Sequence, residues 1–426
     1  MRATAISRAE TSVSRAATRV LPDARWWVCF LAFTALGLTQ AAIKYTTSGG
    51  TLAPAIFLAL WLGLAAAYPA RAARIVLSYR LVYALPLLAL ASATWSAYPA
   101  HTVRVALEFL VTVMVGTFAA GAMPAEMFIS ANTTALFLQV VISLLSGVQE
   151  EIKYAGNEAL SGLFGSKNFM GYISGLLVLF ALATTTDRRQ PVMLRLIGAV
   201  GFLVGAVVLL RARSADAIIG TFIAVAALVF VLLMRALRHQ ARTVLLGATA
   251  MVTLCFTACV VAWHDLLFKL VLAATGKDAS LTGRTYLWNH ARQYISLHPL
   301  LGLGYWSFWV QGNPDAEALW AHFKIHERGG FSFHNMYYQI SVDLGLVGVV
   351  VWFGVFAIVL LTTAVETIRR PSPAIGFFLA FLIFTAVRLG VEVELLGPFD
   401  LDPILIAACW VYVTSAWASR SRSPPR

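Results

Sequence analysis

Charged residues, and acidic ones above all, are scarce in this chain of 426 residues. Only 12% of the residues are charged and 59% are hydrophobic, and 20 acidic side chains stand against 32 basic ones. Because soluble domains carry roughly 25% charged residues, the composition excludes a water-soluble globule, a disordered chain and a nucleic-acid-binding protein. The sequence has four cysteines and none in a Cys-x-x-Cys spacing, which argues against a disulfide framework or a thiolate metal site.

Long apolar segments are what the sequence has in abundance. A membrane-spanning helix needs about 20 mostly apolar residues, and twelve segments approach this requirement. The fold class we expect is therefore an all-α polytopic membrane protein with about twelve transmembrane helices. The expected spans are 26–43, 52–68, 76–95, 103–121, 126–147, 169–185, 192–210, 216–234, 243–263, 343–363, 374–390 and 401–418.

The arginines predict the orientation of these spans. Residues 1–25 carry five arginines and no apolar core, which indicates a cytoplasmic tail rather than a cleavable signal peptide. With this end inside, most arginines fall in cytoplasmic segments, as the positive-inside rule requires. We expect both termini in the cytoplasm, with spans one to nine in 26–263, an external helical lid in 264–333, spans ten to twelve in 334–419 and a tail in 420–426.

The lid segment has mixed polarity and contains helix signals of its own. Ser280–Thr282 can cap a helix that runs through Arg284 to His298 and is stopped by the proline that follows. Gly302–Gly304 predicts a turn, and Gly329–Gly330 predicts a hinge. We therefore expect a folded helical lid rather than a structureless loop.

A smaller group of basic residues falls on the external face, where topology does not explain it. A charge at the rim of a span is costly unless it is paired or faces a wet cavity, so this group is the first functional indication. Its members are Lys44, Arg104, Lys153, Lys167, Arg211, Arg213, Lys269, Lys277, Arg284, Arg292, Lys324, Arg328 and Arg388.

Three of these arginines suit an anionic ligand. Arg211 and Arg213 place two guanidiniums together at a membrane rim, where they can bind phosphate oxygens; the alternative is snorkelling, with Asp216 as a local partner. Arg284 follows Gly283 at a helix start, where backbone N–H groups also favour anions. The alternative for Arg284 is an exposed lid arginine.

His334 returns the chain from the lid to the membrane. Flanked by aromatic residues, a neutral imidazole there can act as a general base toward a sugar hydroxyl, or hydrogen-bond to it. The alternative is an interfacial histidine whose partner is the backbone. Lys167 and Asn168 lie at the external mouth of the sixth span, where a substrate contact and a capping role are equally compatible with the sequence.

The remaining charged pairs have structural and functional interpretations. Arg104 and Glu108 are four residues apart and can neutralise one another. Around Arg388, Glu392 and Glu394 the default is an ion-pair cluster at the membrane edge, with substrate contact as the alternative. His322 and His326 have metal-ligand spacing, but without an HExxH pattern we expect solvated histidines and no metal.

Several stretches together resemble the O-antigen ligase/polymerase superfamily of bacterial inner-membrane glycosyltransferases. The arrangement of a Gly-Arg element and a His-Asn element around a lid is typical of that superfamily, and the span number and the late external loop also fit. The stretches are ATWSAYP at 93–99, GSKNFMG at 165–171, LTGRTYLW at 281–288, HPLLGLG at 298–304, HNMYY at 334–338 and DLGLVG at 343–348.

The resemblance implies a function. It implies an O-antigen ligase that moves a glycan from undecaprenyl diphosphate to the lipid A–core oligosaccharide on the periplasmic face of the inner membrane, without metal or other cofactor. The implied catalytic residues are His334, Arg284 and Arg211, with Arg213 as the alternative to Arg211. A polymerase that uses the same donor, and less favoured a lipid-linked glycan transporter, remain as alternatives.

The resemblance and the charge pattern together also indicate candidate substrate-binding residues. They do not assign the acidic residue of the site. The candidates are Arg213, Lys167, Asn168, Asn335, Arg388 and Arg104. Some members of the superfamily have an acidic residue near the site at the end of the eleventh span. This sequence has no aspartate there, so Glu392 or Glu394 would have to take that role.

Overall fold

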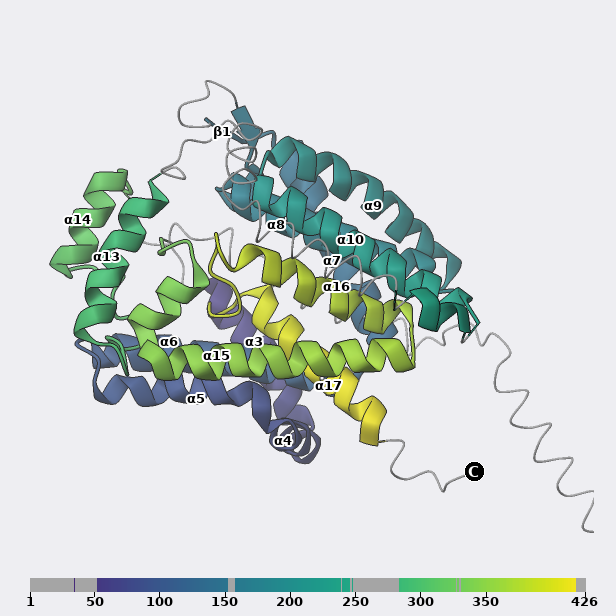
Figure 1. Ribbon diagram of the computed structural model, residues 1–426, viewed down its shortest axis with the longest axis horizontal. Helices are drawn as coiled ribbons and strands as arrows, with labels where there is room; N and C mark the ends of the chain where they lie inside the picture. The colour runs from purple at the N-terminus through teal and green to yellow at the C-terminus, as the bar shows by residue number, and fades with distance from the viewer. Residues whose placement is uncertain are drawn as a thin grey trace, which may run out of the picture.

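The structure is a computed structural model that describes residues 34, 52–151, 158–238, 240–245, 247, 283–326, 328 and 331–418. These residues are mostly helical, and six of their helices are long and apolar enough to cross a membrane, or seven if a bent pair counts as one span. The chain is therefore a multi-pass, all-α membrane protein (Figure 1).

The helices and strands follow one another in the order shown by Figure 1. The first half contains α3 Leu52–Ala67, α4 Pro69–Ser78, η1 Arg80–Tyr83, α5 Ala84–Ala91, η2 Ser92–Thr94, α6 Pro99–Ala122, α7 Ala125–Ser146, β1 Gln149–Glu151, β2 Glu158–Leu160 and η3 Gly162–Phe164. The second half contains α8 Lys167–Thr186, α9 Val192–Ala212, α10 Ala215–Ala236, α13 Arg284–Leu297, α14 Pro314–Phe323, α15 Met336–Arg369, α16 Pro373–Arg388 and α17 Leu401–Ala418.

Most expected spans that fall within the described residues are helices. α6 to α10 cover the five expected spans from 103–121 to 216–234, and α15, α16 and α17 cover those near the C-terminus. The expected span 26–43 lies outside the described residues except for Thr34, as does most of 243–263. The number twelve therefore stays a prediction.

The expected span over 76–95 is helical but is interrupted by a sharp bend. α4 and the helical segment Arg80–Thr94 meet at an angle of 83°. α4 carries Arg71 and Arg74 on a helix with no buried residue, and such a polar, amphipathic helix is suited to an interface rather than an apolar layer. A second feature that the sequence did not predict is an antiparallel pairing of β1 with β2.

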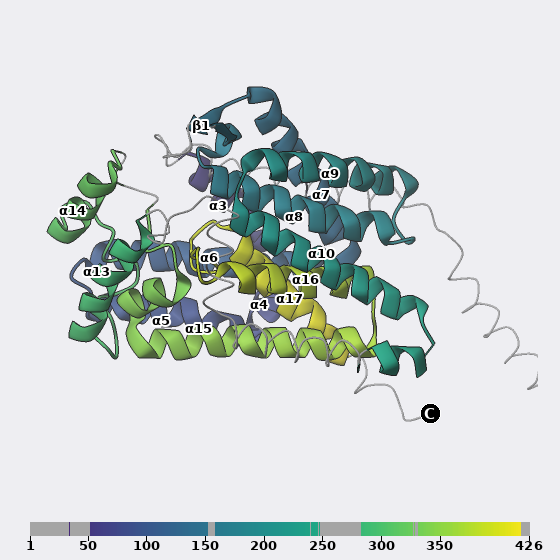
Figure 2. The same cartoon turned by 45° about the horizontal axis from the view of Figure 1, so that its top comes forward.

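α8 lies at the centre of a helical layer and packs against α7, α9, α10 and α16 (Figure 2). Two glycines allow its close approach to α10. A Cβ at Gly171 would lie 2.7 Å from the Cβ of Ser214, and one at Gly175 would lie 2.3 Å from Oγ1 of Thr221. The first turn of α8 is thereby held against the first turn of α10.

The described part of the segment predicted as a lid, which we continue to call the lid, is a helical unit at one end of the described structure, where α13 and α14 lie together in both views (Figures 1 and 2). The predicted helix from Arg284 is confirmed: α13 ends at Leu297, and His298 is its C-cap. Gly283, with φ of +84°, is the N-cap. Residues 280–282 and 329–330, for which we predicted a cap and a hinge, lie outside the described residues.

The lid is joined to α15 by backbone hydrogen bonds at a break in that helix. Gly345 has φ of +62° inside α15, which exposes backbone groups of 342–347 that pair with residues 299–304, as in Leu303 N to Val342 O at 2.8 Å and Leu346 N to Pro299 O at 2.9 Å. A Cβ at Gly345 would lie 2.3 Å from the carbonyl carbon of Leu300. Only glycine combines this φ with this approach.

The 93–99 stretch packs on the same junction. Trp95 donates from Nε1 to the carbonyl of Leu301 at 3.0 Å, and Ser92 Oγ accepts from the backbone N–H of Tyr305 at 2.9 Å. Three of the stretches quoted above, 93–99, 298–304 and 343–348, therefore meet in space and act as a structural joint between the lid and the helices.

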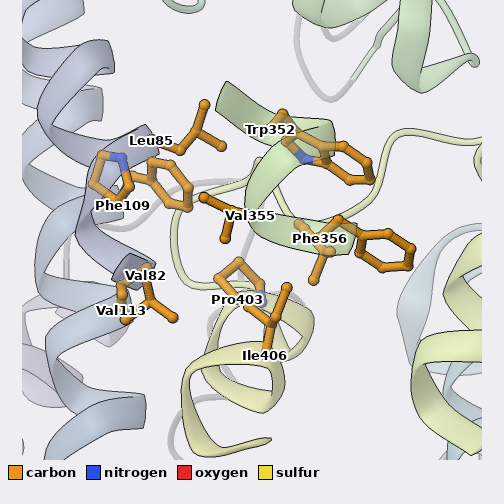
Figure 3. Close-up of a pocket in the computed structure, with 11 residues that line it drawn as sticks. Val82, Leu85, Phe109, Val113, Trp352, Val355, Phe356, Pro403 and Ile406 are labelled. Atoms are coloured by element: carbon orange, nitrogen blue, oxygen red, sulfur yellow. The ribbon is translucent and has the colours of Figure 1, made fainter. Parts of the chain in front are cut away.

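An apolar pocket lies between α5, α6, α15 and α17 (Figure 3). Phe109, Trp352, Phe356 and Ile406 are among its lining side chains, and its volume is about 30 Å³. A cavity of this size holds only a few water molecules, since one water needs roughly 10–15 Å³ of such space. The pocket therefore marks imperfect packing between helices rather than a site for a long lipid chain.

Candidate active site

The carboxylate of Glu392 stands where the lid, α8 and the α16–α17 connection meet. Its Oε1 accepts from Nη2 of Arg284 at 2.8 Å and from Nδ2 of Asn168 at 3.2 Å, and its Oε2 lies 3.2 Å from Nδ1 of His334. The three partners come from positions 168, 284 and 334, so the fold unites residues that are far apart in sequence. All three had been singled out from the sequence.

The environment of Glu392 keeps this carboxylate ionised. Burial alone would raise its pKa, but the hydrogen bond with His334, the charge that His334 carries when protonated, and the charges of Arg284 and Arg388 outweigh burial and lower the pKa to about 2. The side chains of Glu392 and Arg284 are 14% and 13% exposed. A site this poorly hydrated strengthens each of these charge-assisted contacts.

Ionised Glu392 also determines which nitrogen of His334 holds a proton. A carboxylate can only accept hydrogen bonds, so Nδ1 of His334 carries the proton of their 3.2 Å contact. In a neutral imidazole the other nitrogen, Nε2, is then a lone-pair acceptor. The pair therefore has the arrangement of a general base oriented by a carboxylate.

The backbone around His334 is constrained from both sides. His334 has φ of +48°, which is uncommon for a residue with a side chain, and its N–H donates to Oγ of Ser332 at 3.1 Å. Asn335 caps α15 by accepting from the N–H of Tyr338 at 3.2 Å, and donates to the carbonyl of Gly390 at 2.9 Å. Asn335 thus links the start of α15 to the connection that carries Glu392.

α13 is held over the same region by aromatic contacts. Trp288 donates from Nε1 to the carbonyl of Phe333 at 3.0 Å and stacks on Tyr338 with ring centroids 5.6 Å apart. Because Trp288 lies one turn after Arg284, these contacts set the distance between Arg284 and His334.

A second, poorly exposed group of charges is connected to Asn168 through Ser214. Arg388 pairs with Glu394 at 2.7 Å and with Asp216 at 2.5 Å, and its guanidinium lies 5.0 Å from the ring centroid of Tyr172. Ser214 Oγ is 2.7 Å from Oδ1 of Asp216 and 3.2 Å from Oδ1 of Asn168. Through Ser214 and Asn168, this group is continuous with the Glu392 cluster.

The other predicted residues lie around these two groups. Arg211 and Arg213 are exposed at the end of α9, with Arg213 in a left-handed conformation at φ of +49° directly before Ser214. Lys167 is the first residue of α8. Arg104 is exposed on α6 and lines a separate polar cavity.

No side-chain group suited to a metal is found among the described residues. No set of three or more His, Cys, Asp or Glu residues in that part of the chain could hold an ion. His322, one of the two histidines with ligand spacing, instead stacks on Tyr286 with ring centroids 4.3 Å apart.

Sequence reasoning missed two features of the site. Glu392 was named as a member of an ion-pair cluster with Arg388 and Glu394 and as a substitute for an aspartate, but not as the partner of Arg284 and His334. Asp216 was named only as a neighbour of Arg211 and Arg213, whereas the structure pairs it with Arg388. A partial signal was present, because Arg388 and Glu392 are four residues apart at a helix end.

Comparisons with known proteins bear on this geometry. A family model described as O-antigen ligase matches residues 198–353. The exopolysaccharide production protein ExoQ of Rhizobium meliloti (strain 1021) is 28% identical over 386 residues, which is 87% of this chain and 85% of that protein. The chain is therefore similar to proteins of the O-antigen ligase/polymerase superfamily, through the matched segment and through ExoQ.

The part matched by the O-antigen ligase family model runs from α9 into α15 and includes Arg284 and His334. Asn168 and Glu392, which complete the cluster, lie outside that part on either side. The superfamily resemblance drawn from the quoted stretches is therefore confirmed, while the roles of individual residues remain predictions.

Proposed function

We propose that the protein is a glycosyltransferase that moves a glycan from undecaprenyl diphosphate to an acceptor hydroxyl on the periplasmic face of the bacterial inner membrane. The observation that carries the proposal is the contact of His334 and Arg284 with one carboxylate, Glu392. This places a candidate base and a candidate phosphate-binding cation within one poorly hydrated cluster, as transfer from a diphosphate requires.

The acceptor hydroxyl must lose a proton as it attacks. In the proposed reaction, Nε2 of His334 takes that proton while Glu392 holds Nδ1–H and stabilises the imidazolium that forms. A new bond forms between the acceptor oxygen and the anomeric carbon. The bond from that carbon to the phosphate oxygen breaks, and a direct displacement of this kind inverts the anomeric centre.

The diphosphate leaves with the electron pair of the broken bond, so negative charge increases on its bridging oxygen. Arg284 uses Nη2 for Glu392, and a guanidinium has five N–H donors in all. Its further donors, together with exposed Arg211 and Arg213, would neutralise this charge. Because the arginines take that role in the proposal, no Lewis-acid metal is needed.

As acceptor we propose the lipid A–core oligosaccharide, as in an O-antigen ligase. The support is the match to the O-antigen ligase family model over 198–353. The cluster formed by Asn168, Arg284, His334 and Glu392 recognises features that every lipid-diphosphate donor shares, so it does not by itself select an acceptor.

A polymerase is the second candidate, and the similarity to ExoQ favours it. That relative is named for exopolysaccharide production and matches 87% of this chain, a longer stretch than the ligase family model covers. A polymerase would use the same donor and the same proton transfer, with a second lipid-linked glycan as acceptor.

A deletion strain separates the two acceptors. Loss of a ligase should leave the lipopolysaccharide core without glycan while polymerised lipid-linked glycan accumulates. Loss of a polymerase should leave single repeat units where long chains normally stand. Complementation with His334→Ala or Arg284→Ala at normal protein levels should not restore either phenotype, and full restoration by both would refute the proposed site.

A further inference from the structure

A polar cavity of about 580 Å³ lies along α6, lined by residues that precede those of the apolar pocket in this helix. It is bounded by one face of α6, by the turn that follows α13 and by the connection before α17. Its size falls within the range of roughly 300–1,000 Å³ typical of small-molecule sites. The side chains that matter for its chemistry are His101, Arg104, Glu108, Trp306, Trp309 and Asp400.

The cavity is next to the Glu392 cluster. The ring of Phe331 contacts His334 edge-on at a centroid distance of 5.4 Å and contacts Trp309 in the same manner at 5.2 Å. Trp309 lines the cavity. The rings of Phe331 and Trp309 therefore stand between the candidate base and the cavity.

The charges of the cavity are balanced, which argues against a phosphate ligand. Arg104 and Arg328 contribute two cations, and Glu108 and Asp400 contribute two carboxylates. Arg328 also pairs with Glu317, outside the lining, at 3.3 Å. Among the described residues Arg104 has no ion-pair partner within 4.0 Å, although Glu108 lies one turn away on α6. The two charges act on one another without a direct ion pair, so both side chains can contact a ligand.

Balanced donors and acceptors beside indole rings suit a neutral saccharide. Carboxylates accept hydrogen bonds from hydroxyl groups and guanidiniums donate to them, while Trp306 and Trp309 supply large apolar surfaces for the C–H faces of sugar rings. A site with a few placed polar groups and aromatic walls is the usual form of a specific small-molecule pocket.

Three non-glycine residues with positive φ border this cavity. Trp306 and Arg328, which line it, have φ of +52° and +47°, and Phe399, between two lining residues, has φ of +58°. Residues held in such conformations cluster at ligand sites. This backbone geometry is an observation independent of the cavity's chemistry.

We propose that this cavity is a saccharide-binding subsite that holds the acceptor glycan and presents its hydroxyl past Phe331 to His334. The proposal rests on the proposed glycosyltransferase function. Glu108 and Asp400 accept from sugar hydroxyls, Arg104 donates to them, and the indole of Trp306 packs against a ring face.

Binding can be measured separately from transfer. The purified full chain in detergent is titrated with two probes by saturation-transfer NMR: the host's lipopolysaccharide core oligosaccharide, and the repeat-unit oligosaccharide released from its surface glycan by mild acid. Wild type and His334→Ala should both bind one of these probes. Arg104→Ala and Glu108→Gln should each weaken that binding at least about tenfold, because hydrogen bonds to charged groups contribute about 1.5–3 kcal/mol.

Leu107→Ala is the matched control, since Leu107 is 44% exposed on α6 and does not line the cavity; it should bind like wild type. Binding of both probes unchanged in Arg104→Ala and Glu108→Gln, or absent in wild type, would overturn the subsite. Initial rates identify the source of the saccharide, because an acceptor subsite raises KM for the acceptor alone. If KM rises for the donor instead, the acceptor assignment is wrong.

The proposed function fails in a different way. Saccharide binding that depends on Arg104 and Glu108, with no transfer by wild type from any undecaprenyl-diphosphate glycan, would keep the subsite and refute the glycosyltransferase. If transfer requires His334 but is unchanged in Arg104→Ala and Glu108→Gln, the proposed glycosyltransferase function stands and the subsite is refuted.

Discussion

Replacing Glu392 with glutamine removes one charge from the centre of the candidate site while keeping its shape. The amide can still accept from Arg284 or Asn168, but its NH₂ group now faces Nδ1 of His334 and favours the tautomer with the proton on Nε2. His334 would then have no lone pair directed at the acceptor hydroxyl. The substitution thus tests Glu392 as a positioning residue for both His334 and Arg284.

The expected loss of activity follows from the proton transfer. General base catalysis contributes typically 10²–10⁴-fold, so Glu392→Gln should lower kcat by about 10²- to 10⁴-fold. Glu392→Asp keeps the charge on a shorter side chain and should restore part of this loss, which a purely structural role would not predict.

The same substitution has a pH-dependent effect on stability. The pKa of Glu392 is lowered from 4.5 to about 2, so the ionised carboxylate stabilises the folded state above about pH 4.5, and this contribution is lost as the pH falls through about 2. The difference corresponds to about 3 kcal/mol. Glu392→Gln should therefore reduce stability at pH 7 by up to about this amount and flatten its dependence on pH between 4.5 and 2.

The assay is glycan transfer by purified protein in lipid nanodiscs, with thermal unfolding followed between pH 2 and pH 8 on the same samples. Glu158→Gln, an acid-to-amide change at an exposed position of β2, is the matched control and should behave like wild type. Transfer by Glu392→Gln within about threefold of wild type, in folded protein, would refute the reasoning on His334 and Arg284.

Three further predictions follow from other parts of the structure. Gly345→Ala should destabilise the protein by more than about 2 kcal/mol in thermal unfolding, because it combines a left-handed φ with contact to Leu300; Gly354→Ala, in the same helix with open space, should be near neutral. Arg388→Met should cost about 3–5 kcal/mol by leaving two buried carboxylates unpaired, and equal stability would contradict the pairing. EDTA should leave transfer unchanged, and a rate restored only by added divalent ion would contradict the metal-independent proposal.

The helices were the most predictable part of the fold. Continuous apolar runs identify α6 to α10 because the apolar layer of a membrane requires such runs. The bend after α4 was harder to predict from the sequence, since its position depends on where the side chains of Arg71 and Arg74 can reach water. The joint at Gly345 was also hidden, because its glycine is explained by Leu300, a residue 45 positions earlier whose approach no local pattern reveals.

Several residues of the candidate site could be predicted from the sequence, but the contacts between them could not. Arg284 and His334 stood out because a cation at the start of a helix and a histidine at a membrane rim are unfavourable unless a partner or a ligand compensates for them. Their shared contact with Glu392 could not be derived, since it depends on how α13 and the α16–α17 connection meet. Asp216 illustrates the same limit: its nearest basic neighbours in sequence are Arg211 and Arg213, but its partner in space is Arg388.

Reconstituted transfer tests the central claim most directly. Purified wild-type protein, given a defined undecaprenyl-diphosphate glycan and an acceptor in nanodiscs, should form a glycosidic product with inverted anomeric configuration and release undecaprenyl diphosphate in equal amount. His334→Ala should abolish product formation while the protein stays folded. Absence of product with both the core oligosaccharide acceptor and a lipid-linked glycan acceptor, or full product formation by His334→Ala, would contradict the account.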